Sequence, residues 1–134
     1  MKTLAPTAPC PCGRVQGKKP LAYAHCCGRF LDSDTPALDA ESLMRSRYSA
    51  FVLEREAYLL HTWHPDKRPA QLEFDTDVKW LGLEVRDAVQ RDATHAEVEF
   101  VARQKPVSGA AVRLHERSRF EKQDGRWLYL DAIV

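Results

Sequence analysis

The pattern of hydrophobic and polar residues changes from a helical spacing to an alternating one about halfway along the chain. Leu43 and Phe51 belong to a stripe that recurs at the period of an α-helix, and Asp39 just before it is a favourable N-cap. The stripe is interrupted near Glu54 and resumes until shortly before Pro65, which disfavours helix in the residue that precedes it. The sequence therefore predicts one helix, a break and a second, shorter helix.

The second half of the chain predicts an antiparallel sheet. From Val78 onward apolar residues alternate with polar ones, and the pair Asp124 and Gly125 is a strong signal for a tight hairpin. Helices followed by consecutive strands predict an α+β fold, in which the helices pack against one face of a curved antiparallel sheet. The expected strands cover residues 79–90, 95–105, 110–122 and 126–133.

The alternation places two acidic residues among hydrophobic ones. Glu116 is in phase with Leu114 on one strand, and Asp131 is in phase with Trp127 on the next. We expect both carboxylates to face the interior of the fold, where an unpaired charge is costly.

Arg47 lies on the apolar stripe of the first helix, so a cation is available to these carboxylates. One hypothesis is a polar pocket at the open end of the cone that the curved sheet and the helices form. The hypothesis that the sequence favours is that Arg47 and Glu116 form a buried ion pair whose role is to fix the docking of the helix. The candidate pocket consists of Arg47, Tyr48, Glu116 and Asp131 above a floor of Trp63, Trp80 and Trp127.

An uneven charge distribution sets the first part of the chain apart. The 134 residues have a net charge of +1, but residues 1–31 carry five basic and no acidic residues, whereas residues 32–134 carry 15 basic and 19 acidic ones. There is no export signal and no apolar stretch of the length that spans a membrane, so we expect a soluble protein of the reducing cytosol. We place a domain boundary between residues 1–31 and residues 32–134.

All four cysteines lie in the basic segment, as the pairs Cys10 and Cys12 and Cys26 and Cys27. A disulfide within either pair would be strained, and disulfides between the pairs would need an oxidising compartment. A redox pair would need a C-x-x-C spacing that the chain lacks. Two close pairs joined by a loop suit a tetrahedral zinc ion better, and a closed set of four thiolates makes that zinc structural. The five basic residues would offset the net charge of −2 on such a centre.

The sequence "CPCG…YAHCCG" resembles the SEC-C zinc knuckle, which implies Cys10, Cys12, Cys26 and Cys27 as the zinc ligands. The 13 residues between Cys12 and Cys26 are more than this motif usually has, so we expect the segment "VQGKKP" to bulge outward. The similar knuckle of the SecA translocation ATPase serves protein contacts, which implies a protein-binding role here.

The ordered segments "LMRSRYSAF", "YLLHTWHP", "HERSRF" and "DGRWLYLDA" resemble the YchJ-like family of small bacterial proteins. This resemblance implies a nuclear transport factor 2-like (cystatin-like) cone that follows an N-terminal SEC-C knuckle. Cone cavities of that superfamily host acid/base chemistry in some members, which implies Glu116 or Asp131 as a general base, with Tyr48 as a hydrogen-bond donor.

Three functions follow from these patterns. The favoured one is a monomeric zinc-binding interaction module whose basic knuckle docks an acidic protein surface. The alternative is small-molecule binding or acid/base catalysis in the cavity around Glu116. Weak nucleic-acid contact through the knuckle is disfavoured, because few aromatic residues accompany its cations. For the favoured function we expect metal removal to unfold the knuckle and leave the cone folded.

Overall fold

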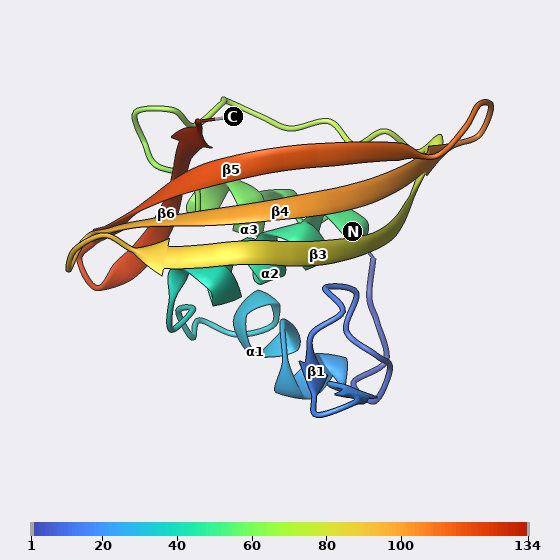
Figure 1. The fold of residues 1–134 in the computed structure, drawn as a ribbon, viewed down its shortest axis with the longest axis horizontal. Helices are drawn as coiled ribbons and strands as arrows, with labels where there is room; N and C mark the ends of the chain where they lie inside the picture. Colours follow the sequence, from blue (N-terminus) through green and yellow to red (C-terminus); the bar gives the residue numbers. More distant parts are fainter. Residues whose placement is uncertain (1, 134) are drawn as a thin grey trace.

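The computed structural model describes residues 2–133, which form a curved antiparallel sheet over a layer of helices, with the cysteine-containing segment below them (Figure 1). The N-terminal segment contains the short strands β1 (Val15–Gln16) and β2 (Lys19–Pro20), the 3₁₀ helix η1 (Tyr23–His25) and the helix α1 (Gly28–Leu31). The helices α2 (Ala40–Val52) and α3 (Glu56–His61) follow. The sheet consists of β3 (Val78–Gln90), β4 (His95–Pro106), β5 (Val112–Gln123) and β6 (Arg126–Ala132).

Local sequence signals fix the ends of the two main helices. The side-chain Oδ1 of Asp39 accepts a hydrogen bond of 2.7 Å from the backbone N–H of Ser42, which confirms Asp39 as the N-cap of α2. The break predicted near Glu54 is also confirmed, because Glu54 has a left-handed backbone with φ of 55° between α2 and α3. Such a conformation ends a helix and turns the chain back on itself.

The four long strands are neighbours in chain order and all pairs are antiparallel. Their bounds differ from the predicted ones by two residues at most. The turn between β5 and β6 is built as predicted, since Asp124 and Gly125 have φ angles of 51° and 79°. Two consecutive positive φ angles are the signature of a type I′ hairpin.

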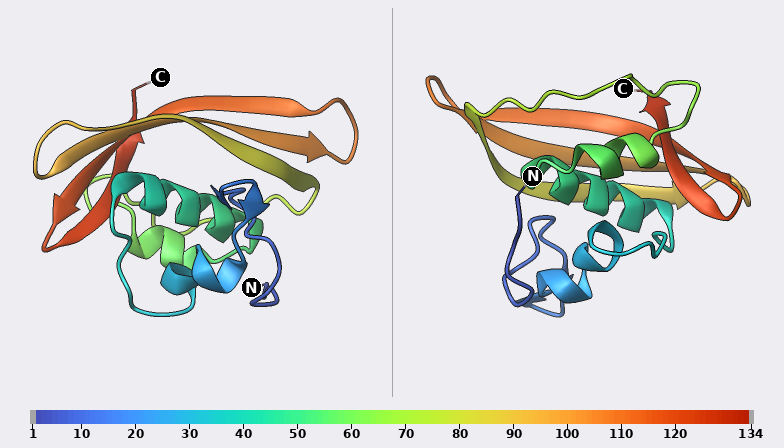
Figure 2. Two further views of the ribbon diagram at one scale, coloured as in Figure 1. Left: turned by 60° about the horizontal axis from the view of Figure 1, so that its bottom comes forward. Right: turned by 180° about the vertical axis from the view of Figure 1, so that it is seen from behind.

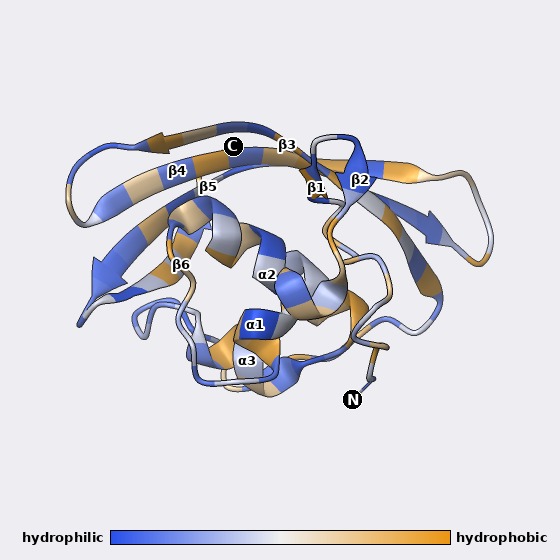
Figure 3. Ribbon diagram, turned by 90° about the horizontal axis from the view of Figure 1, so that it is seen from below, coloured by the Kyte–Doolittle hydropathy of each residue, from blue (hydrophilic) through white to orange (hydrophobic). Residues whose placement is uncertain are grey.

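Three β-bulges give the sheet its curvature. In β3 the register slips past Leu81 and again past Arg86, and in β6 it slips past Leu130. Each bulge bends its strand and increases the local twist. The result is an arch whose hollow side holds α2 and α3 (Figure 2). Seen from below, the helices lie within the arch and hydrophobic and hydrophilic residues alternate along the strands (Figure 3). These features confirm the predicted α+β cone.

The cysteine segment shares one hydrophobic core with the rest of the protein. The buried side chains of Tyr23 and Phe30 belong to the same cluster as Leu43 and Met44 of α2, and the cluster continues to Phe120 on β5. The division at residues 31 and 32 stays a prediction from composition. In the structure, the described part of residues 1–31 has no hydrophobic core separate from that of the domain above it.

A network of charges covers the face of the sheet opposite the helices. Arg117 lies 2.7 Å from Glu97, 2.9 Å from Asp87 and 3.1 Å from Glu99, and Arg91 also contacts Glu97 at 3.1 Å. Hydrogen bonds from Arg91 and Arg117 lower the pKa of Glu97 from the ordinary 4.5 to about 2. The carboxylate is therefore more acidic in the folded chain than in the unfolded one.

We expect this network to make the stability dependent on pH in the acidic range. Because the pKa of Glu97 is lower in the folded state, its contribution is present above about pH 4.5 and is lost as the pH falls toward 2. Urea unfolding at pH 6 and pH 3 should show a smaller loss of stability in Glu97→Gln than in the wild type. The exposed Glu73, which has no ion pair among the described residues, provides the control Glu73→Gln. An equal loss in wild type and Glu97→Gln would contradict the expectation.

Candidate functional site

The structure brings the four cysteines together beneath α2. Cys10 and Cys12 precede β1, Cys26 follows η1, and Cys27 immediately precedes α1. All four are buried, their sulfur atoms lie within 4.8 Å of one another, and the Sγ atoms of Cys12 and Cys26 are 3.5 Å apart. None of the four is in a disulfide.

Backbone pairing closes this cluster. Pro9 and Ala22 form an isolated antiparallel bridge, and the N–H of Cys10 donates to the carbonyl of Leu21 at 2.9 Å. The 13 residues between Cys12 and Cys26 therefore fold back on themselves. The segment "VQGKKP" forms the exposed hairpin of β1 and β2, which turns at Gly17 with φ of 65°. The extra length thus projects outward and leaves the two cysteine pairs close.

Gly28 is needed for the close approach of η1 and α1. A Cβ atom at this position would lie 2.7 Å from the backbone oxygen of Tyr23 and 3.0 Å from its ring. Contacts this short with backbone atoms do not occur, so a larger residue would push apart η1 and α1, the two elements that flank Cys26 and Cys27.

The thiols are close enough to influence one another's protonation. Hydrogen bonding from Cys12, Cys26 and Cys27 lowers the pKa of Cys10, whereas hydrogen bonding to Cys10, Cys12 and Cys26 raises the pKa of Cys27. The hydrogen bonds among the thiols therefore favour a thiolate at Cys10 and a protonated thiol at Cys27.

Cations accompany the sulfur cluster. The guanidinium group of Arg45 donates to the carbonyl of Cys12 at 3.1 Å, and that of Arg29 donates to the carbonyl of Cys26 at 3.0 Å. On the other side the hydroxyl of Ser49 on α2 lies 3.6 Å from the Sγ of Cys10. Positive charge beside the sulfurs favours thiolates, the form in which cysteine binds metal.

The donor set fits a closed tetrahedral metal site. Four sulfurs at 2.3 Å from a zinc ion are about 3.8 Å apart, close to the spacing that the cluster already has. His25, the neighbouring imidazole, is exposed and is not in the cluster. The four cysteines can therefore hold a metal ion without a further ligand from the chain.

A separate cavity of about 550 Å³ lies between α2 and the hollow face of the sheet. Arg47, Tyr48, Trp63, Trp80 and Glu116, which the sequence analysis grouped together, all line it. Most of the remaining wall is apolar or aromatic. It consists of Met44, Phe51, Phe100, Ala102, Leu114, Phe120 and Tyr129, with Ser118, Arg113 and His115.

Asp131 does not belong to this cavity, contrary to the sequence-based grouping. The bulge at Leu130 shifts β6 by one residue, so that Tyr129 pairs with Phe120 but Asp131 pairs with Arg119. A one-residue slip moves a side chain to the other face of the sheet. The carboxylate of Asp131 is accordingly held by Arg119 on the outer face, with two contacts of 2.6 Å.

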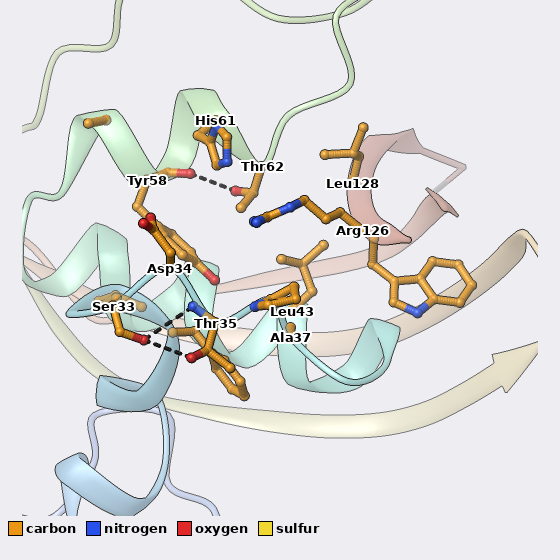
Figure 4. A pocket seen from close by; sticks show the side chains of 15 residues that line it. Ser33, Asp34, Thr35, Ala37, Leu43, Tyr58, His61, Thr62, Arg126 and Leu128 are labelled. Carbon is orange, nitrogen blue, oxygen red and sulfur yellow. Dashed lines mark hydrogen bonds between the residues drawn. The ribbon is translucent and has the colours of Figure 1, made fainter. Parts of the chain in front are cut away.

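Trp127 also lies elsewhere, although it does face inward. It is buried near the start of β6 and lines a second pocket of about 440 Å³. This pocket lies between α3, β6 and the segment that joins α1 to α2, with Asp34, Tyr58 and Arg126 around it (Figure 4). Alternation shows on which face of a strand a residue lies, but not how far along the strand it is. This position along the strand separates Trp127 from the cavity around Glu116.

The favoured ion pair between Arg47 and Glu116 is wrong. Arg47 instead donates two hydrogen bonds of 2.8 Å, to the carbonyl of Leu59 and to the hydroxyl of Thr62. Glu116 accepts hydrogen bonds from Ser118 and, at 3.1 Å, from the hydroxyl of Tyr129. Arg47 thus connects α2 to the end of α3, through the backbone of Leu59 and the side chain of Thr62. Glu116 has no part in this contact.

Tyr129 is the residue that links Arg47 to Glu116 in the cavity, and the sequence analysis did not include it in the predicted pocket. Its ring lies 4.7 Å from the guanidinium carbon of Arg47, while its hydroxyl reaches Glu116. Its phase with Trp127 was visible in the sequence, but only the tertiary structure shows that Tyr129, which pairs with Phe120, reaches along β5 to Glu116 with its hydroxyl.

Known proteins resemble this chain over nearly its whole length. The family model described as "YchJ, middle NTF2-like domain" matches residues 39–132. A UPF0225 protein of Polaromonas sp. (strain JS666) is 66% identical over 132 residues, with 96% of this chain and 95% of that protein covered. The UPF0225 protein of Bordetella parapertussis is 56% identical over 130 residues, with coverages of 95% and 93%.

Two solved structures share the fold. The solution structure of RPA3114, a SEC-C motif containing protein from Rhodopseudomonas palustris, has a TM-score of 0.77 and 33% identity, with 93% of this chain and 97% of that chain covered. The crystal structure of a SEC-C motif containing protein from Psychrobacter arcticus has a TM-score of 0.78 and 32% identity, with coverages of 96% and 84%.

Fold and site together define an NTF2-like α+β protein that carries a SEC-C-type cluster of four cysteines at its N-terminal end. The chain belongs to the YchJ-like family. Among the helices of residues 2–133, none has the length and apolar character needed to cross a membrane.

The contact at Gly28 yields a test of the cysteine centre. We expect Gly28→Ala to destabilise the chain by about 1–3 kcal/mol, because the added methyl group overlaps the backbone of Tyr23. The same variant should retain less metal after dialysis, since η1 and α1 move apart. Ala24→Ser, a small change at an exposed residue of η1, is the control. Wild-type stability and metal retention in Gly28→Ala would show that the close approach is not needed.

Proposed function

We propose that the protein binds one zinc ion through Cys10, Cys12, Cys26 and Cys27 and that this zinc is structural. The observation that carries the proposal is the convergence of four buried thiols, none of them in a disulfide, within 4.8 Å of one another. Four thiolate ligands fill the coordination shell and leave no position for a substrate, so the ion would stabilise the fold without taking part in a reaction. The SEC-C motif in the names of the two solved relatives supports the same assignment.

The zinc would act on more of the fold than the knuckle alone. Because Cys10 contacts Ser49 of α2 and all four cysteines belong to the common core, a metal-free cluster would loosen the packing beneath α2. We therefore expect chelation to lower the stability of the whole chain. This differs from the expectation from sequence that the cone keeps its stability, and thermal unfolding with and without chelator decides between the two.

The first experiment is elemental analysis of the full chain, purified without added metal. We expect one zinc ion per chain in the wild type and a large loss in Cys26→Ser, which removes one ligand. His25→Ala is the matched control, because it changes the adjacent exposed side chain and should retain the zinc. No zinc in the wild type, or the same zinc content in Cys26→Ser, would overturn the proposal.

We further propose that the hairpin of β1 and β2 binds an acidic protein surface. It projects from the cysteine centre, Lys18 and Lys19 at its tip are exposed, and Val15 is 53% exposed beside them. The described part of residues 1–31 contains no acidic side chain that would neutralise these lysines locally. A positive, projecting strand pair with an apolar residue suits an acidic partner.

A glutamate-rich peptide tests the hairpin. NMR titration of the full chain should show shifts confined to residues 14–20, and the double variant Lys18→Glu, Lys19→Glu should abolish them. The control carries Lys79→Glu and Lys105→Glu at the exposed end of the β3 and β4 pair. Shifts spread over the whole surface, or tighter binding of oligouridylate to the hairpin, would contradict an acidic protein partner.

A further inference from the structure

The cavity between α2 and the sheet contains a buried cation that has no carboxylate in direct contact. Arg47 is 6% exposed and lines the cavity, and among the described residues no carboxylate lies within 4 Å of its guanidinium group. Burial lowers its pKa to about 10, while the charge of Glu116 in the same cavity acts in the opposite direction, so Arg47 still carries its charge at neutral pH. A buried cation is costly unless an anion compensates it.

The chain supplies only part of that compensation. The two hydrogen bonds of Arg47 both come from Nη1, which leaves Nε and Nη2 without a hydrogen bond among the described residues. Its guanidinium carbon lies 5.0 Å from the ring of Trp63 and 4.7 Å from that of Tyr129. These rings stabilise the cation through their faces but accept no hydrogen bond in its plane.

A second donor beside Arg47 is also unsatisfied. The indole Nε1–H of Trp63 is buried and has no hydrogen-bond partner, although such groups usually find one. Trp63 and Arg47 line the same cavity and are in contact. An acceptor with two oxygens would suit the free edge of the guanidinium group, and carboxylate has the matching planar geometry.

The other residues that line the cavity indicate which kind of molecule can fill it. The rings of Tyr48, Phe51, Trp80 and Phe100 give the cavity an aromatic lining. Its volume of about 550 Å³ is in the range of small-molecule sites. Glu116 also lines the cavity and has no cation within 4 Å among the described residues, so it can accept a hydrogen bond from the ligand.

We propose that this cavity binds a small organic carboxylate with an apolar or aromatic body, and that Arg47 holds the carboxylate group. Glu116 lies in the same cavity with its carboxylate oriented by Ser118 and Tyr129. It selects ligands that also carry an N–H or O–H donor and disfavours a second anionic group. This proposal is independent of the zinc centre and of the hairpin.

The test uses three ligands of one shape with the full chain. 3-Phenylpropionate carries the carboxylate alone, phenethylamine the ammonium group alone, and phenylalanine both. By NMR titration we expect 3-phenylpropionate to shift the resonances of the cavity residues and to bind at least tenfold more tightly than phenethylamine. Phenylalanine should bind at least as tightly as 3-phenylpropionate. No binding of either carboxylate, or tighter binding of phenethylamine, would overturn the proposal.

Variants assign the effect to the proposed donors. Arg47→Lys keeps a cation but not the planar pair of donors, and Trp63→Phe removes the indole N–H while it retains an aromatic ring. Each should weaken 3-phenylpropionate binding about tenfold. Trp127→Phe makes the same substitution in the second pocket, outside this cavity, and is the matched control that should change the affinity less than threefold. Because Arg47 also holds α3, thermal unfolding must first show that Arg47→Lys is folded, and Trp63→Phe tests the site without changing Arg47. Unchanged affinity in both variants would refute the assignment.

Discussion

The packing of the four-cysteine cluster against α2 is the constraint on which the N-terminal part of the protein depends. Residues 1–31 contain too few large apolar side chains to build a core of their own. The described part of this segment packs instead through its cysteines, Tyr23 and Phe30 into one hydrophobic core with the buried residues of α2. The same helix carries Arg47 on the side that faces the cavity. The 13-residue helix α2 therefore lines the cavity and also covers the cysteine centre.

Curvature of the sheet is the second constraint. The bulges at Leu81, Arg86 and Leu130 bend the strands over the helices and leave the space that becomes the cavity. The bulge at Leu130 also decides which acidic residue faces inward, because it turns Asp131 toward Arg119 on the outer surface. Glu116 is left as the carboxylate of the cavity wall, held by Ser118 and Tyr129.

The relatives show that the cysteine segment and the cone occur together as one unit. The UPF0225 protein of Polaromonas aligns with 96% of this chain, and the Psychrobacter structure also spans 96% of it. This agrees with the shared core, in which the cysteines pack in one cluster with residues of α2 and Cys10 contacts Ser49. α2 therefore contacts the cysteine centre through Ser49 and lines the cavity through Arg47 and Tyr48, and the two sites differ in chemistry.

Most elements of this fold could be predicted from the sequence, because local rules specify them. The N-cap at Asp39, the break at Glu54, the turn at Asp124 and Gly125 and the strand bounds all depend on residues near in the chain. The cysteine spacing likewise limited the chemistry of the cluster, since two close pairs on one loop have few geometries available.

What only the tertiary structure decided is which side chains meet across the fold. Alternation correctly placed Glu116 on the inner face, but it implied the same for Asp131, because a bulge in β6 has no signature in the sequence. The expected partner of Arg47 was also wrong. A guanidinium group reaches several ångströms, and the carbonyl of Leu59 and the hydroxyl of Thr62 come within its reach only after α3 has folded back along α2. The sequence by itself determined the elements and the kinds of chemistry present, whereas register and packing determined which of these groups share a cavity.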